Sequence, residues 1–397
     1  MKKTCVPKLR FAEFKDSGEW QEKKLGQLLK IGNGRDYKHL SKGDIPVYGT
    51  GGYMLSVDEY LYDGESVCIG RKGTIDKPFM LYGKFWNVDT LFYTHSFNKC
   101  TPKFIYACFQ NINWYKYNSA TGVPSLTKIT IENIQLLIPT LPEQKKIADC
   151  LSSIDEIIDL QTQKLERLKQ HKKGLMQKLF PKEDQTTPDW RFAEFRDSGW
   201  EKQELGHIFK ITSTKRVHES EWQNEGIPFY RARELVSLAQ GYKISPLYID
   251  EELYIKNIKL SGEINKGDLL VTGVGSIGIP YLVKNNDKFY FKDGNIIWLK
   301  NDEKTILGKF LYLFYQSEYI QNQIKKITGI GTVATYTIDN ARKTIISFPK
   351  IKEQQKIADC LSSIDELIEL QTQKIENLKQ HKKGLMQGLF PNPTEVI

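Results

Sequence analysis

Apolar side chains recur along residues 146–181 at spacings that alternate between four and three. They stand at Ile147, Leu151, Ile154, Ile158, Leu165, Leu168, Leu175 and Leu179, with Gln161 and Lys172 at the two remaining positions of the series. This is the heptad pattern of a helix that packs along another helix. Residues 356–391 repeat the pattern, so the sequence predicts two long helices in one chain.

The two heptad stretches are copies of one another. Their 36 aligned residues differ at five positions, namely Ile157/Leu367, Asp159/Glu369, Leu165/Ile375, Arg167/Asn377 and Lys178/Gly388. Two nearly identical blocks separated by unlike sequence indicate a tandem duplication. We expect the helices to pair with each other through the seam residues Leu151, Ile154, Ile158, Leu165, Leu168, Leu361, Ile364, Ile368, Ile375 and Leu378.

The charges along the two copies predict how the helices pair. The first half of each copy is acidic, with residues such as Asp155 and Asp365, and the last part is basic, with residues such as Lys172 and Lys382. Antiparallel pairing places acidic ends beside basic ends, whereas parallel pairing places like charges together. The same gradient would also complement the dipole of each helix taken alone. Only an antiparallel coiled coil satisfies both effects, so we expect that arrangement.

The duplication extends beyond the helices. The segment RFAEFKDSG that begins at Arg10 returns as RFAEFRDSG at Arg191, and each copy leads into a region of short apolar runs and glycine-rich turns. Short strands with a few helices, and without βαβ alternation, predict an α+β fold. The predicted organisation is a domain at 1–140, a long helix at 141–181, a second domain at 182–350 and a second long helix at 351–391.

Motifs for catalysis are missing from the chain. Gly273, Gly275 and Gly278 match the pattern GxGxxG after a predicted strand, but Pro280 and more apolar residues follow instead of a helix. A dinucleotide site needs that helix, so the sequence favours a turn between strands. We find no Walker A lysine, no convincing nuclease cluster and no Asn/Asp-Pro-Pro-aromatic motif of an amino-methyltransferase.

Metal binding and disulfides are not expected either. The six histidines are scattered, and the six cysteines form no CxxC pair. Cys150 and Cys360 stand beside the heptad seam, so we expect them to be small buried side chains. No apolar run reaches the length of a membrane span, and the N-terminus lacks the apolar stretch of a signal peptide, so the cytoplasm is the expected location.

The net charge of +9, with a pI near 8.9, favours a polyanionic partner. Basic and aromatic residues gather in predicted loops of both variable regions, where arginine can bind guanine or phosphate and tyrosine or histidine can pack on sugars and bases. Any one of these residues could equally be a solvated surface charge. The candidate DNA contacts are Arg35, Tyr37, Lys38, His39, Arg71, Lys72, Lys215, Arg216, His218, Tyr230, Arg231 and Arg233.

Together these segments resemble the DNA-specificity subunit of type I restriction-modification enzymes. The resemblance covers essentially the whole chain. Lys352 stands where the first copy has Pro142, a departure that bears on how the second helix begins. The segments that carry the resemblance best are the two RFAEF entries, LPEQKKIADCLSSID at 141–155 and IKEQQKIADCLSSID at 351–365.

The resemblance implies two target-recognition domains, each of which reads one half of a bipartite DNA target. The paired helices would set the gap between the halves and dock two modification subunits, which carry S-adenosylmethionine and methylate adenine N6. Motor-nuclease subunits, which use ATP and Mg, would complete the complex. The chain itself would hold no cofactor or metal and would leave base flipping to the modification subunit, so it would not be catalytic.

Two other classes of function stay open on the residues alone. A stand-alone DNA-binding regulator or a coiled-coil scaffold would show the same basic loops and helices, and neighbouring methyltransferase and helicase-nuclease genes would argue against it. A single-chain enzyme is disfavoured by the missing motifs. A purified chain that is inert towards DNA and S-adenosylmethionine would exclude that class.

Overall fold

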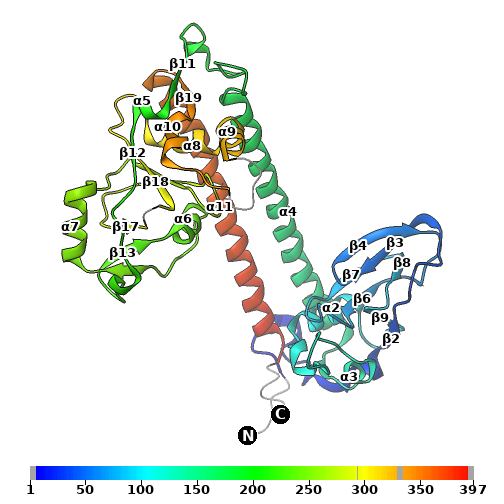
Figure 1. Cartoon of the computed structure of the whole chain (residues 1–397). Helices are drawn as coiled ribbons and strands as arrows, with labels where there is room; N and C mark the ends of the chain where they lie inside the picture. The colour runs from blue at the N-terminus through cyan, green and yellow to red at the C-terminus, as the bar shows by residue number, and fades with distance from the viewer. Residues whose placement is uncertain (1–5, 293, 329–333, 392–397) are drawn as a thin grey trace. The chain divides into compact units, whose positions relative to one another are not determined.

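The computed structural model describes residues 6–292, 294–328 and 334–391. The chain forms two compact units, of which unit 1 contains residues 1–163 and 372–397 and unit 2 contains residues 164–371. The long helices α4 (Leu141–Leu179) and α11 (Ile351–Leu389) each contribute one half to each unit (Figure 1). Of the six cysteines, Cys5 lies outside the described residues.

Unit 1 is built mainly from short strands. Two four-stranded sheets have the orders β2-β9-β6-β7 and β4-β3-β8-β5, and β1 pairs with β10. Two helices and a 3-10 turn follow the strands. The elements are η1 (Ala12–Phe14), β1 (Gln21–Lys24), α1 (Leu25–Leu28), β2 (Lys30–Asn33), β3 (Lys42–Gly49), β4 (Gly52–Val57), β5 (Tyr62–Asp63), β6 (Ser66–Gly70), β7 (Phe79–Leu81), β8 (Lys84–Asn87), β9 (Leu91–His95), α2 (Pro102–Asn111), η2 (Trp114–Tyr117), α3 (Lys128–Glu132) and β10 (Gln135–Ile138).

Unit 2 repeats this order with an insertion. Its sheets have the orders β12-β18-β15-β16, β14-β13-β17 and β11-β19. The elements are η3 (Ala193–Phe195), β11 (Glu201–Glu204), α5 (Leu205–Ile208), β12 (Lys210–Thr212), η4 (Glu219–Glu221), β13 (Ile227–Tyr230), α6 (Ala232–Ala239), β14 (Leu247–Ile249), α7 (Glu251–Ser261), β15 (Leu269–Thr272), β16 (Pro280–Leu282), β17 (Tyr290–Phe291), β18 (Ile296–Lys300), α8 (Gly308–Gln316), α9 (Glu318–Thr328), α10 (Ile338–Lys343) and β19 (Ile345–Phe348).

The predicted α+β class is confirmed, because both units mix largely antiparallel sheets with helices. Most of the extra length of the second region lies between β13 and β15, where α6, β14 and α7 stand in place of β4 and β5. The GxGxxG stretch is a turn from β15 into β16, as predicted, with Gly275 and Gly278 at φ of 75° and 76°. That backbone conformation favours glycine, and no helix follows it.

The two helix halves in each unit run antiparallel. In unit 1 the Lys382 ammonium lies 2.7 Å from the Asp155 carboxylate, and in unit 2 Lys172 lies 2.6 Å from Asp365. These pairs join the same two positions of the repeat, so acidic and basic ends meet as the charge gradient predicts. Every predicted seam residue faces inward, either buried (Leu151, Leu165, Leu361, Ile364, Ile375) or partly buried (Ile154, Ile158, Leu168, Ile368, Leu378).

A buried carboxylate fastens each long helix to the entry segment of its unit. Glu143 accepts hydrogen bonds from Arg10 at 2.7 and 2.8 Å and from the Trp20 indole at 3.2 Å. Its side chain is 1% exposed, so the charge depends on these partners. In unit 2 Glu353 accepts the same bonds from Arg191 and Trp200.

The neighbouring glutamines fasten the helices to the sheets. Gln144 is fully buried and binds backbone groups of Lys99, Thr101 and Pro139. Gln354 likewise binds backbone groups of Thr305, Leu307 and Pro349. The Glu-Gln pair of each helix start therefore positions the variable domain on the helix, since each buried polar atom finds its partner there.

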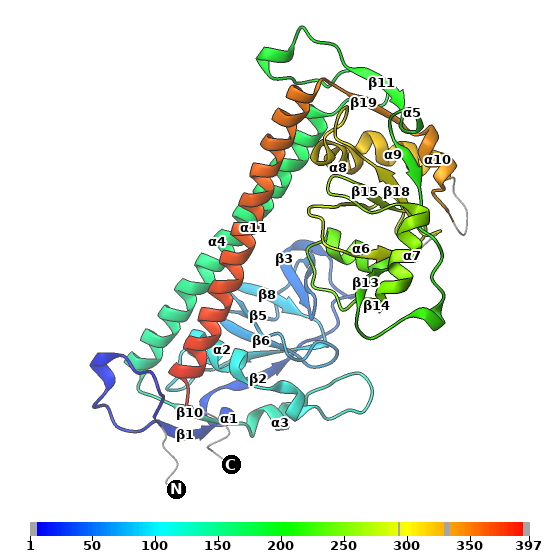
Figure 2. The same ribbon diagram turned by 90° about the vertical axis from the view of Figure 1, so that its left-hand side faces the viewer.

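The entry segment also meets the end of a long helix in each unit. Leu9 donates its N–H to the Gly388 carbonyl at 2.8 Å, and Trp190 donates to the Lys178 carbonyl at 3.0 Å. Figure 2 shows β1 and β10 beside the last turns of α11, and Ile138, Leu389 and Phe390 belong to one buried cluster there. In unit 2 the helix end and the entry segment are joined directly by the linker 182–189. In unit 1 the entry segment and the end of α11 lie at opposite ends of the sequence.

Candidate DNA interface

In unit 1, three loops meet around the turn from β8 to β9. Arg35 donates its N–H to the Asn87 carbonyl at 2.8 Å, and Arg71 donates to the Thr90 carbonyl at 2.7 Å. Gly34 lies so close to this turn that a Cβ would be 1.9 Å from the Val88 carbonyl oxygen, so only glycine fits there. The structure thus brings together two predicted clusters that are 36 residues apart in the sequence.

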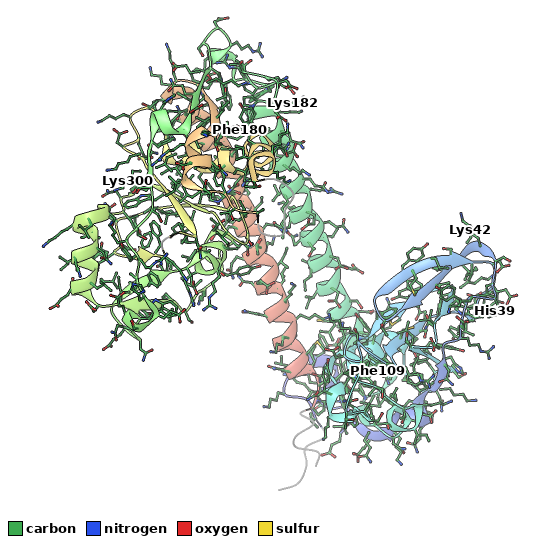
Figure 3. The ribbon with its side chains drawn as sticks, viewed as in Figure 1. His39, Lys42, Phe109, Phe180, Lys182 and Lys300 are labelled. Atoms are coloured by element: carbon green, nitrogen blue, oxygen red, sulfur yellow. The ribbon has the colours of Figure 1, made fainter. Side chains whose placement is uncertain are left out.

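The side chains of these clusters are exposed. Arg35, Lys38, His39, Arg71 and Lys72 all face solvent. Figure 3 shows His39 and Lys42 at the outer end of unit 1, on the segment that leads into β3, whereas Phe109 lies in the interior. Exposed cations on ordered loops can reach a phosphate backbone.

Three of the predicted residues also contribute contacts that stabilise this edge of the unit. The His39 ring packs edge-on against Trp86 with centroids 5.8 Å apart, and the Trp86 indole donates to the Arg35 carbonyl at 2.9 Å. Tyr37 is half-buried and packs on the cluster that contains Trp86. Tyr37 therefore has a packing role in addition to any DNA contact.

In unit 2, the strand exit that corresponds to Arg35 carries Lys215. The pairing Ile31–Thr94 in unit 1 matches Ile211–Leu299 in unit 2, which sets this correspondence. The Tyr290 hydroxyl accepts from the Lys215 N–H at 2.9 Å. Lys215, Arg216 and His218 are exposed, so a second basic edge forms at the same place in the frame.

The cluster after β13 is more constrained than the sequence indicates. Arg231 makes two hydrogen bonds with the Glu234 carboxylate and packs over the Trp222 ring at 5.7 Å, and its side chain is 20% exposed. Arg233 also binds Glu234, at 2.7 Å, but stays 73% exposed. Arg233 therefore keeps most of its side chain in solvent although Glu234 binds it, while Arg231 holds the loop. Tyr230 is half-buried against Phe289, with centroids 4.9 Å apart.

Burial and ion pairing act oppositely on Glu234. Burial alone would raise the pKa of this carboxyl, but the hydrogen bonds from Arg231 and Arg233 outweigh it, and the pKa is lowered below its ordinary value of 4.5. Glu234 is therefore charged at neutral pH and keeps both arginines in place.

An aromatic cluster in unit 1 is missing from the sequence-based prediction. Tyr93 packs against Tyr62 at 5.5 Å and against His95 at 5.6 Å, and all three rings are partly exposed. Gly32 faces Tyr93, and a Cβ there would come within 2.2 Å of its ring. Burial, with help from Lys30 and Lys128, lowers the pKa of His95, which keeps the ring neutral at pH 7. Such rings can pack on sugars or bases.

The glycine turns correspond residue by residue between the units but carry different side chains. Lys72 pairs with Ser125 in unit 1, and Val274 pairs with Thr335 in unit 2. Leu126 donates its N–H to Arg71 just as Tyr336 donates to Gly273. The cations Arg71 and Lys72 of unit 1 are thus replaced by Gly273 and Val274 in unit 2.

Other chemistry is not indicated within the described residues. Among them, no cluster of histidine, cysteine and acidic side chains could hold a metal ion, and no helix is long and apolar enough to cross a membrane. The five described cysteines are free thiols, and burial raises the pKa of Cys68 to about 12. Cys150 and Cys360 are half-buried rather than buried as predicted, because they stand beside the seam and not in it.

Comparison with known proteins decides which family this frame belongs to. A family model described as the type I restriction modification DNA specificity domain matches residues 17–170 and 197–380. The chain belongs to the type I restriction-modification DNA-specificity family. The family model matches the chain twice in tandem, which confirms the predicted duplication. Membership of this family also confirms the prediction of a non-catalytic specificity subunit.

Individual relatives of this specificity subunit are similar over most of their length. A putative type I restriction enzyme specificity subunit of Haemophilus influenzae, S.HindORF215P, is 27% identical over 333 residues, which cover 82% of this chain and 81% of that protein. The MjaVIII specificity subunit of Methanocaldococcus jannaschii is 27% identical over 350 residues, covering 85% and 78%.

A solved structure shares the fold. The crystal structure of a type I restriction-modification S subunit from M. genitalium superposes with a TM-score of 0.65 at 17% identity, covering 98% of this chain and 99% of that one. The tandem α+β fold of this chain is therefore also the fold of a known specificity subunit.

Proposed function

We propose that unit 1 and unit 2 each read one half of a bipartite double-stranded DNA target. The observation that supports this proposal is that the two units share a fold but carry different side chains at corresponding loop positions. Arg35, Arg71 and Gly49 of unit 1 correspond to Lys215, Gly273 and Arg231 of unit 2. Sequence is read by side chains at base edges, so two similar frames with different loops would read different half-sites.

Exchange of residues 32–140 for the first variable region of another specificity subunit tests this proposal. The exchanged protein, expressed with its partner subunits, should methylate DNA at a target whose first half is new and whose second half is unchanged. The reciprocal exchange of residues 212–350 is the matched control and should alter only the second half. A change of both halves by either exchange would contradict the proposal.

We also propose that the outer faces of the long helices dock two modification subunits, one in each unit. Most exposed residues of the long helices are identical in the two copies, although the domains around them have diverged. Leu160 is 61% exposed and its counterpart Leu370 is 68% exposed. An apolar side chain left open twice at the same position is typical of a protein contact that is used twice.

The docking surface is tested by Leu160→Asp and Leu370→Asp, alone and together. Each single variant should bind one modification subunit instead of two, and the double variant should bind none, as measured by native mass spectrometry of co-expressed proteins. Leu260→Asp is the matched control, because Leu260 is 65% exposed on α7 and lies outside the repeat. Full binding by the double variant would contradict this proposal.

The rest of the assembly follows from this docking. S-adenosylmethionine would be held by the modification subunits, and ATP and Mg by the motor-nuclease subunits, while this chain binds double-stranded DNA. The helices would set the gap between the half-sites. Insertion of one heptad into both helices should change the gap in the methylated motif and leave both half-sites as they are, and changed half-sites would count against this role.

A further inference from the structure

The loop at residues 118–126, between η2 and α3, is a rigid and exposed element of unit 1. The Asn118 carboxamide oxygen accepts from the N–H groups of Ala120 at 3.1 Å and Ser125 at 2.9 Å, and Ser119 donates its N–H to the Ser125 carbonyl. Trp114 before the loop and Leu126 at its end are buried. The two ends of the loop are therefore fixed by hydrogen bonds and by buried side chains.

The loop is fastened to the basic turn at residues 70–73. Gly73 donates its N–H to the Pro124 carbonyl and Leu126 donates to the Arg71 carbonyl, both at 2.9 Å. Lys72 and Ser125 form an additional bridge between the two segments. These contacts make the turn and the loop one structural element.

The tip presents an apolar side chain in basic surroundings. Val123 is 55% exposed, and Thr121 and Gly122 beside it also face solvent. Residues 111–131 contain Lys116 and Lys128 and no acidic residue, and Lys128 lies 3.7 Å from the carboxylate of Glu132. The exposed cations Arg71 and Lys72 adjoin the loop. The Arg71 guanidinium lies over the Phe92 ring and donates a hydrogen bond to the Asp89 carbonyl.

Charge and shape together select duplex DNA as the partner of this element. A solvated valine on this loop has no packing role in the unit, and the exposed cations Arg71 and Lys72 beside it attract a polyanion. Apolar side chains such as valine contact the methyl group of thymine or wedge at base steps, while lysine and arginine bind phosphates. An element held rigid before binding loses little conformational entropy on contact.

We propose that the loop 118–126 and the turn 70–73 form one DNA-reading element of unit 1, in which Arg71 and Lys72 bind phosphates and Val123 contacts a base edge of the first half-site. This inference rests on the proposed function of unit 1. In unit 2 the turn has Gly273 and Val274 at the matching positions, so the element adds a contact that the second half-site lacks.

The test uses the complex of this chain with its modification subunits and duplexes that carry the methylated target, the target with a scrambled first half, or random sequence. Val123→Ala should weaken binding to the full target about fivefold, because the two methyl groups that it removes would no longer be buried against the base edge. Binding to random DNA should be unaffected. Val6→Ala is the matched control, because Val6 is also exposed and the substitution removes the same atoms. It should bind like the wild type.

The cations give a different signature. Lys72→Ala and Arg71→Ala should weaken binding to all three duplexes by similar factors, and each should lower the slope of log K against log salt concentration by about one. Thermal unfolding midpoints close to that of the wild type would show that these variants remain folded.

Two outcomes would overturn the inference. Equal behaviour of Val123→Ala and Val6→Ala on every duplex would remove Val123 from the interface. An equal loss on all three duplexes for Val123→Ala would make the contact non-specific. A wild-type complex that did not distinguish the full target from the scrambled first half would contradict the proposed function instead, so the two failures are separable.

Discussion

Units 1 and 2 share the buried contact between the entry segment and the long helix, and they differ in their exposed loops. Arg10, Glu143 and Trp20 form in unit 1 the contact that Arg191, Glu353 and Trp200 form in unit 2. Outside this shared contact, unit 1 has Arg71 and Lys72 on its glycine turn, whereas unit 2 has Arg231 and Arg233 after β13.

The difference shows which positions the fold controls and which it leaves to recognition. A buried carboxylate without its partners would destabilise the domain strongly, so the frame tolerates little change. An exposed loop residue contributes little to folding, so it can change with the DNA target. Each of the following variants tests one side of this comparison.

The largest effect should come from the buried carboxylates. Glu143→Ala leaves Arg10 and the Trp20 indole without their partner, and we expect a loss of about 3–5 kcal/mol in the free energy of unfolding of unit 1. Glu353→Ala should cause a similar loss in unit 2. Hydrogen exchange of the amides in β10 and β19, followed in denaturant, measures the two units separately.

A surface pair nearby provides the control for that experiment. Glu13 lies 3.0 Å from Lys146, and both side chains are about half exposed. Glu13→Ala should leave stability nearly unchanged, because an exposed pair is weak. If Glu143→Ala were equally mild, the buried contact would not be what holds the helix to the domain.

An intermediate effect is expected from the ion pair between the helix halves. Lys382→Asp should destabilise unit 1 by about 1 kcal/mol or somewhat more, since it places two carboxylates together where Lys382 now binds Asp155. The exchange Lys382→Asp with Asp155→Lys should restore most of the loss. Denaturant midpoints of the single and double variants measure this coupling, and a double variant as weak as the single one would exclude the ion pair as its source.

The smallest expected effect is a pH-dependent contribution of Glu234 to the stability of unit 2. The folded-state pKa of Glu234 is depressed, so this group contributes stability above its ordinary pKa of 4.5 and loses it as pH falls through the lower folded value. In unit 1 the strand β4 follows β3 at this place, where unit 2 has α6 with Glu234. Melting curves should show Glu234→Gln less stable than wild type at pH 7, with the difference narrowing below pH 4.5. A constant difference across this range would point to packing rather than charge.

The long helices, their antiparallel pairing and the α+β class could be predicted from the sequence, because heptad spacing and the charge gradient are local signals. The same holds for the turn after β15, where Pro280 follows the glycines in place of a helix. The contact of Glu143 with Arg10 could not be predicted, since 133 residues separate the partners. The sequence gives one indication of this contact, because Arg10 and Glu143 recur in the second copy as Arg191 and Glu353.

The candidate interface was predictable only in part. Basic clusters are visible in the sequence, but the meeting of Arg35 with Arg71 depends on strand register, and the Tyr62–Tyr93–His95 cluster is contributed by two strands of different sheets. The binding of Arg231 by Glu234 also needed coordinates, because a carboxylate three residues away in a chain can point in any direction. The DNA contacts themselves stay predictions.

We infer that this chain gives a restriction-modification complex its DNA sequence specificity. Single-molecule methylome sequencing of the host, with and without this gene, is the decisive measurement of that role. We expect N6-methyladenine to disappear at one bipartite motif when the gene is removed and to return when the gene is restored. Methylation that stays complete at every bipartite motif after removal of the gene would contradict that role.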